Sequence, residues 1–190
     1  MSDLYIEGQV FDRDDFSKRG LEQGEYENCS FNDCILSNAD LKGSNFIACE
    51  FKNCDLSTAK IINTAFREIK FKNCKMLGLH FNTCNPFLFS AEYESCQLNL
   101  SSFYKCSLKN TIFEKCSLNE VDFAESDLTS STFNNCDLIG ATFEHTILEK
   151  ADFRMAYNFL INPETNRIKK AKFSMAGVAG LLSKYDIEIE

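Results

Sequence analysis

Large apolar side chains recur at every fifth position along most of the chain. The series runs in one frame from Ile6 to Phe81, slips by two positions, resumes from Leu88 to Phe153, and can be traced again as far as Phe173. Neither the turn of an α-helix nor the two-residue alternation of a β-strand produces a period of five. We therefore expect short extended steps with a corner after each one, repeated as a solenoid.

Each step offers two inward positions. The large residue defines the central position, and a small side chain lies two positions before it, as Cys49 does before Phe51. In the first half the central residues repeat the order aromatic, aliphatic, aliphatic, aromatic every 20 residues, which is four steps. The expected fold is all-β: a right-handed, four-sided parallel β-helix over residues 1–173, with coils about 4.8 Å apart. Two columns of stacked rings are expected, one of Phe11, Phe31, Phe51 and Phe71 and one of Phe113, Phe133, Phe153 and Phe173.

All ten cysteines occupy the small inward position, which favours buried, reduced thiols that act as small apolar side chains. A zinc site would require closely spaced cysteine pairs, often with histidine. The nearest pairs here have four intervening residues and lie on different walls, and His80 and His145 are expected to point outward. We expect no metal, no cofactor and no disulfide network. The cysteines are Cys29, Cys34, Cys49, Cys54, Cys74, Cys84, Cys96, Cys106, Cys116 and Cys136.

The frame slip falls within residues 83–88, where Asn85-Pro86 is a turn signal. A two-residue bulge or corner loop is expected there. Two interpretations stay open: the bulge is a kink between two stacks, or it is a loop that contacts a partner.

The pattern changes after the repeat, in residues 174–190. Ser174 is a plausible N-cap for a helix over 175–183, which Gly177 and Gly180 should weaken. Residues 186–190 alternate like a short edge strand. This apolar end is either a lid or a dimer interface, and the dimer is favoured. Its predicted contact residues are Met175, Val178, Leu181, Leu182, Ile187 and Ile189.

The net charge of −8 disfavours direct binding to nucleic acid or to anionic lipid. Residues 86–161 carry 11 acidic and 5 basic side chains, a balance of −6. The wall centred on Phe103, Phe123 and Phe143 is the candidate partner surface, although an ordinary solvated acidic face remains the alternative. The predicted partner-binding residues are Asp122, Glu125 and Glu144, with Glu120, Asp127 and Asp137.

The sequence offers no chemistry for catalysis. The cysteines face inward, the two histidines lie far apart, and no glycine-rich phosphate loop is present, so we expect no catalytic residue and no enzyme. The N-terminus lacks the features of a secretory signal, and no apolar run approaches the ~20 residues of a membrane span. A cytoplasmic location without membrane contact is expected.

Several steps match the pattern A(D/N)LXX, among them 39–43 (ADLKG), 54–58 (CDLST) and 151–155 (ADFRM). Over residues 6–173 the chain resembles the pentapeptide-repeat family. Its opening, YIEGQVFDRDDF and GEYENCSF, and its closing AKFSMAGVAGLLSKYDIEIE resemble the Qnr/MfpA quinolone-resistance group.

This resemblance implies a rod-shaped homodimer joined through the C-terminal helix. It also implies a non-enzymatic DNA mimic, whose acidic surface binds DNA gyrase or topoisomerase IV and limits quinolone damage. The chain departs from many Qnr proteins because it has no long loop insertion. The alternative function is a structural scaffold with an unknown protein partner.

Overall fold

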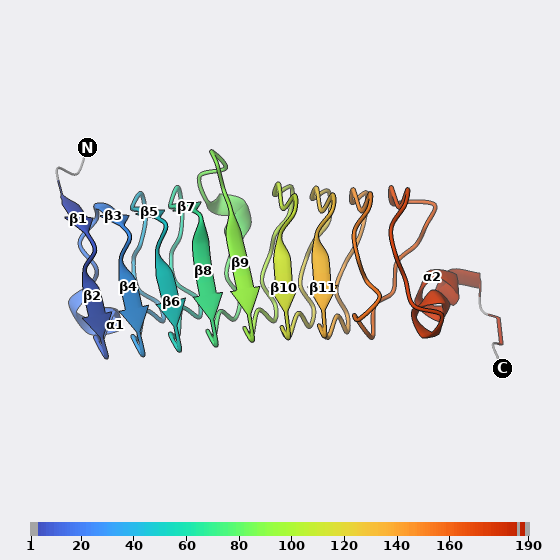
Figure 1. Ribbon diagram of the computed structural model, residues 1–190, viewed down its shortest axis with the longest axis horizontal. Helices are drawn as coiled ribbons and strands as arrows, with labels where there is room; N and C mark the ends of the chain where they lie inside the picture. Colours follow the sequence, from blue (N-terminus) through green and yellow to red (C-terminus); the bar gives the residue numbers. More distant parts are fainter. Residues whose placement is uncertain (1–3, 186, 189–190) are drawn as a thin grey trace.

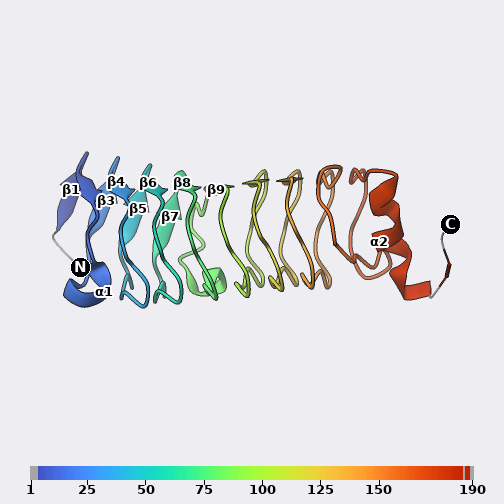
Figure 2. The same ribbon diagram turned by 90° about the horizontal axis from the view of Figure 1, so that it is seen from below.

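The computed structural model describes residues 4–185 and 187–188. The chain winds into a rod of stacked coils, with its two ends at opposite ends of the rod (Figure 1), and the orthogonal view shows the same elongated shape (Figure 2). All paired strands are parallel, and successive coils are offset by 20 residues, as Tyr26 opposite Phe46 illustrates. The predicted parallel β-helix is confirmed.

Two of the four walls carry regular strands. Wall 1 holds a four-stranded sheet: β1 (Tyr5–Glu7), β3 (Glu25–Glu27), β5 (Asn45–Ile47) and β7 (Ala65–Arg67). Wall 2 holds a seven-stranded sheet: β2 (Val10–Asp12), β4 (Ser30–Asn32), β6 (Glu50–Lys52), β8 (Ile69–Lys72), β9 (Ala91–Glu94), β10 (Ile112–Glu114) and β11 (Thr132–Asn134). The other two walls are joined by isolated bridges such as Asp55 to Lys75 and Asp122 to Thr142. Wall 3 is centred on Leu36, Leu56, Met76, Leu98, Leu118 and Leu138, and wall 4 on Leu41, Ile61, Phe81, Phe103, Phe123 and Phe143.

The corners explain why asparagine is frequent. The residue two positions after a central residue has a positive φ at corner after corner, for example 57° at Asn38 and 55° at Asn63. Asparagine and glycine tolerate this left-handed conformation better than other residues. The sequence pattern had assigned this position only to solvent, whereas the structure shows that it turns the chain.

The two predicted ring columns are one column. Phe71 stacks on Tyr93 at 5.5 Å between ring centroids, and Tyr93 stacks on Phe113 at 5.0 Å. The column on wall 2 is therefore continuous from Phe11 to Phe173. A second column on wall 4 meets it edge to face. Each such ring pair contributes about 0.5–1.5 kcal/mol beyond the area it buries.

The small inward positions are hydrogen-bonded as well as buried. The Cys54 thiol donates to the carbonyl oxygen of Phe31, one coil away, at 3.2 Å, and the Thr64 hydroxyl donates to Leu41 at 2.8 Å. Nine of the ten cysteines are buried, as expected, while Cys106 is only partly buried. A small donor at this position therefore tethers one coil to the next.

The predicted central role of Leu88 is wrong. Leu88 is 64 % exposed and has a φ of 56°, which is typical of a corner residue. The five-residue frame of the first half therefore extends through Leu88, two positions after Pro86. The two extra residues are Phe89 and Ser90. The Ser90 N–H donates to Phe66 at 3.0 Å, and beyond it Ile69 pairs with Ala91 at an offset of 22. The first frame would place Pro86 at the centre, where it stays exposed, and the ring of Phe89 packs against the core instead.

The remaining elements are short helical turns: α1 (Phe16–Arg19), η1 (Phe81–Thr83), η2 (Ala176–Val178), α2 (Ala179–Leu182) and η3 (Ser183–Tyr185). The last three form a cap across the end of the rod (Figure 1), with an α-helical part of only four residues instead of the nine expected. The first turn starts one residue later than predicted, with Met175 before it, but the Ser174 Oγ accepts the Gly177 N–H at 3.0 Å, the hydrogen bond expected of a capping serine. Position 186 and positions 189–190 of the predicted terminal strand lie outside the described residues, and Ile187 and Glu188 are not in a strand.

The glycines of this cap permit a close contact. A Cβ at Gly180 would lie 2.3 Å from the backbone oxygen of Phe159, and one at Gly177 would lie 2.9 Å from its ring. The Ile161 N–H also donates to the Gly180 carbonyl at 3.0 Å. Gly177 and Gly180 were expected only to weaken the helix, but they let it lie flat on the last coil.

Candidate protein-binding surface

The carboxylates of the predicted surface gather on wall 4, which we call the acidic wall where it is centred on Phe103, Phe123 and Phe143. Asp122 pairs in register with Ser102 on one side and Thr142 on the other. The Glu125 N–H donates to the Glu144 carbonyl at 2.8 Å, so Glu144 lies one coil beyond Glu125. Asp122 and Glu144 therefore lie on wall 4 in successive coils, and Glu125, with a φ of 55°, lies at the corner that ends wall 4 in the coil of Asp122.

Asp122 is held by local hydrogen bonds. Its carboxylate accepts the Ser102 hydroxyl at 3.2 Å and the Ala124 N–H at 2.9 Å. The residue is half-buried. Such a carboxylate presents its charge in a defined place, with less conformational freedom to lose when a partner binds.

Glu125 is ordered by a residue that the sequence analysis did not single out. The Tyr104 hydroxyl donates to it at 2.8 Å, and the Lys105 ammonium lies 3.3 Å away. The hydrogen bond from Tyr104, followed by the interactions with Lys105, holds the pKa of Glu125 below its usual range. Glu125 is therefore ionised, but Lys105 neutralises part of its field. The only sequence signal for Tyr104 was its outward position next to the centre Phe103.

The other three predicted carboxylates do not all reach this wall. Glu120 is exposed at the corner between walls 3 and 4. Asp127 lies on wall 1, where it accepts from Thr129 and pairs with Lys109 at 3.2 Å. Asp137 lies on wall 3 and accepts the Asn158 side-chain N–H at 2.8 Å. The six residues thus place two carboxylates on wall 4, two at the corners that border it, and two on other walls.

The residues predicted to form the dimer interface differ in how exposed they are. Met175 is 91 % exposed and Ile187 is 55 % exposed, whereas Val178 and Leu182 are half-buried. Leu181 packs against the core of its own chain. Position 189 lies outside the described residues. Met175 and Ile187 are therefore the members of this set most available to another molecule.

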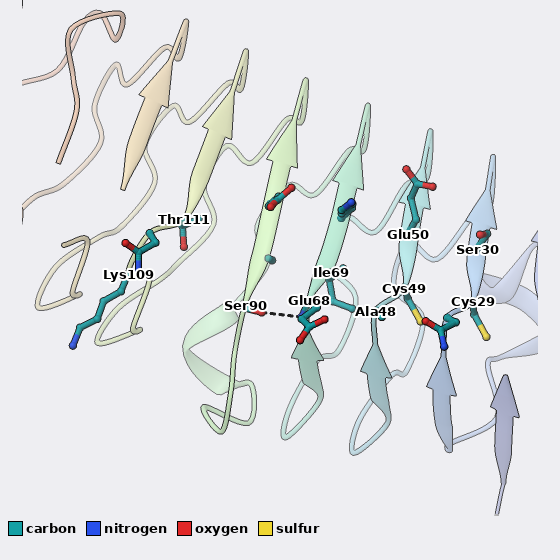
Figure 3. A pocket seen from close by; sticks show the side chains of 15 residues that line it. Cys29, Ser30, Ala48, Cys49, Glu50, Glu68, Ile69, Ser90, Lys109 and Thr111 are labelled. Carbon is teal, nitrogen blue, oxygen red and sulfur yellow. Dashed lines mark hydrogen bonds between the residues drawn. The ribbon is translucent and has the colours of Figure 1, made fainter. Parts of the chain in front are cut away.

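A groove of about 710 Å³ runs along the corner between walls 1 and 2 (Figure 3). Its charged groups are mixed, with Glu50, Glu68 and Glu92 beside Lys70 and Lys109. It contains no histidine, and its two cysteines are buried thiols that donate to backbone carbonyls. Within the described part of the chain, no cluster of three or more metal-ligating side chains occurs.

These observations define a solenoid that offers flat walls for binding. The chain belongs to the pentapeptide-repeat family, since the model of the pentapeptide repeat region matches residues 25–86 and 87–157. Among curated proteins no sequence match is found. None of the helices in residues 4–185 and 187–188 has the length and apolar character needed to cross a membrane.

Solved structures share the fold. HetL, a pentapeptide-repeat protein involved in heterocyst differentiation regulation in the cyanobacterium Nostoc sp. strain PCC 7120, is 15 % identical with a TM-score of 0.56. That match covers 89 % of this chain and 85 % of HetL. Full-length QnrB1, described as a plasmid-mediated fluoroquinolone resistance protein, is 20 % identical with a TM-score of 0.44, covering 95 % of this chain and 99 % of QnrB1.

Proposed function

We propose that this chain is a DNA mimic that binds a type II topoisomerase, DNA gyrase or topoisomerase IV, at the surface that otherwise holds duplex DNA. The observation that carries the proposal is the group formed by Asp122 and Glu144 on wall 4 and by Glu125 at the corner of that wall, along an elongated rod. The Qnr/MfpA-like opening and closing segments of the sequence support the same partner. The proposed action is non-enzymatic and cytoplasmic.

The net charge of the rod is small for a DNA mimic, so recognition would depend on where the carboxylates lie and not on how many there are. Duplex DNA carries one charge per ~1.7 Å of its axis. A dimer of this chain would carry twice −8, or −16, and Lys105 already offsets part of the acidic wall. A basic DNA-binding saddle would therefore have to recognise ordered carboxylates such as Asp122 and a fitting shape. Association of this kind should weaken as salt rises.

A dimer through the C-terminal cap would improve the fit. It would bring the acidic stretches of both subunits toward the centre of a longer rod. Met175 projects from the cap, and the exposed side chains of Tyr157 and Leu160 lie on the last coils. We propose this end as the dimer interface.

The test reverses the charge of the acidic wall. Asp122→Lys, Glu125→Lys and Glu144→Lys combined should weaken binding to purified gyrase and topoisomerase IV by at least about tenfold in low salt, with little change in folding stability. The matched control is the triple reversal of Glu50, Glu68 and Glu92, three exposed carboxylates that line the groove on another corner. Equal losses in both triples would point to nonspecific charge and contradict the site.

The scaffold alternative makes a different prediction, and the exposed loop residues Phe87 and Leu88 favour it. A scaffold would show no topoisomerase binding at low salt and no effect on supercoiling or on quinolone-induced cleavage. If the variant with Asp122, Glu125 and Glu144 reversed to Lys still binds gyrase or topoisomerase IV, the proposed partner would stand but the acidic wall would not be the binding surface.

A further inference from the structure

The loop that interrupts the repeat opens a small pocket beside two thiols. The pocket measures about 220 Å³ and lies among Phe81, Cys84, Phe89, Lys105 and Cys106. The segment between β8 and β9 projects from the rod at this level (Figure 1). Among the ten cysteines Cys106 is the one that is only partly buried, so this pocket is where solvent reaches a thiol.

Cys84 and Cys106 occupy the same inward position on adjacent coils. The residues before and after them in this column are Ser44, Thr64, Ser126 and Thr146, which carry hydroxyls. The pair is 22 residues apart because Phe89 and Ser90 are inserted between them. Neighbouring coils stack about 4.8 Å apart, so the two thiols enter the pocket one above the other.

A second observation concerns the buried hydroxyl of Tyr93. Tyr93 is 1 % exposed, and its hydroxyl has no hydrogen-bond partner. After burial itself, the groups that most raise the pKa of this hydroxyl are Cys84 and Cys106, ahead of Cys96 and Cys116. A buried donor without an acceptor costs stability, so its retention beside two thiols indicates that an acceptor forms there in some state.

We propose that Cys84 and Cys106 form a two-coordinate site for a soft monovalent metal ion of the Cu(I) type. Thiolates select such ions. Two Cu(I)–sulfur bonds in line, each somewhat shorter than the ~2.3 Å of a zinc–sulfur bond, span a distance slightly below the coil spacing of about 4.8 Å. The cysteine spacing that argues against tetrahedral zinc does not argue against a linear ion.

The chemistry of binding balances without a redox step. Both S–H bonds break, two protons leave to solvent, and two S–Cu bonds form while copper stays Cu(I). The resulting bis-thiolate carries one negative charge, and Lys105 lines the same pocket. A metal-bound thiolate is also a far better acceptor than a thiol, so the Tyr93 hydroxyl gains the partner it lacks.

The other stacked cysteines of the chain provide a control for the proposed site. Six cysteines stack on wall 3, but they are all buried and their thiols donate to carbonyls of the adjacent coil. All six thiols are more buried than that of Cys106, so an ion in solution has less access to them. The ladder residues are Cys34, Cys54, Cys74, Cys96, Cys116 and Cys136.

The experiment titrates the intact, reduced chain with Cu(I) under anaerobic conditions, using the coloured bicinchoninate complex as the donor. We expect one Cu(I) per chain by competition and by native mass spectrometry. Cys84→Ser and Cys106→Ser should each lower the affinity at least about 100-fold. Both variants should fold, because serine or threonine occupies this column on neighbouring coils. Cys116→Ser, in the ladder, should leave affinity and stoichiometry unchanged.

Tyr93→Phe provides an independent readout. It should keep one Cu(I) per chain but weaken binding several-fold, because the hydrogen bond to the thiolate is lost. Three results would each overturn the proposal: no Cu(I) withdrawn from bicinchoninate, unchanged affinity in Cys84→Ser or Cys106→Ser, or a loss of binding in Cys116→Ser.

Discussion

The ring of Tyr93 stacks on the ring of Phe71 at 5.5 Å with 12° between their planes, although 22 residues separate them where the repeat provides 20. The two additional residues, Phe89 and Ser90, lie at the corner before Tyr93, outside this ring contact. The register of the core therefore survives the insertion. A solenoid tolerates such a corner insertion because each coil contacts only its neighbours.

The inward frame predicts a sharp contrast in stability. Phe51→Ala and Phe123→Ala should each cost about 3–5 kcal/mol, since both rings are fully buried between stacked neighbours. Lys52→Ala, on the exposed side of the same strand as Phe51, should cost less than about 0.5 kcal/mol. Urea unfolding of the three variants measures this, and similar costs at positions 51 and 52 would contradict the frame.

Tyr93→Phe should behave unlike the other core substitutions. The buried hydroxyl has no partner, and the adjacent rings of the column are phenylalanines. Removing an unpaired buried donor should raise the unfolding free energy by about 1–3 kcal/mol. Thermal and urea unfolding of the metal-free protein are the measurements. A clear destabilisation would show that the hydroxyl has an acceptor, such as a buried water.

The dimer proposal predicts the effect of charge at the C-terminal end. Met175→Asp combined with Ile187→Asp should convert a dimer to a monomer in light scattering, because a carboxylate buried in an apolar interface is costly. Ile62→Asp is the control, since Ile62 is 53 % exposed but lies on wall 4 in an earlier coil. If the unaltered chain is monomeric at high concentration, the cap is only a lid.

Asp127 should contribute to the loss of folding stability at acid pH. Burial raises the pKa of its carboxyl, but hydrogen bonds from Thr129 and the pairing with Lys109 outweigh this and lower the pKa below its usual value. A carboxyl with a lowered folded-state pKa stabilises above its unfolded pKa of about 4, and this stabilisation is lost as pH falls through the folded value. Asp127→Asn should therefore lower the urea midpoint at pH 7 more than at pH 3. Equal shifts at both pH values would assign the effect to packing instead.

Much of the fold could be predicted because one short-range rule repeats. The inward assignment of Phe51, and of every cysteine except the partly exposed Cys106, follows from counting in fives. The capping hydrogen bond of Ser174 followed from its local sequence. The candidate surface was predicted in part, since Asp122 and Glu144 share wall 4 and Glu125 lies at its corner. The ordering role of Tyr104 depends on a contact with the adjacent coil.

The sequence by itself determined the period, the number of walls and which side chains point inward, because each depends on residues within one or two steps of one another. The tertiary structure decided what depends on contacts between coils. It placed Leu88 at a corner and Phe89 against the core, joined two ring columns through Tyr93, and gave Gly180 a packing role against Phe159. These outcomes depend on which residues meet across a full coil. A two-residue insertion changes that register without changing the local pattern on either side of it.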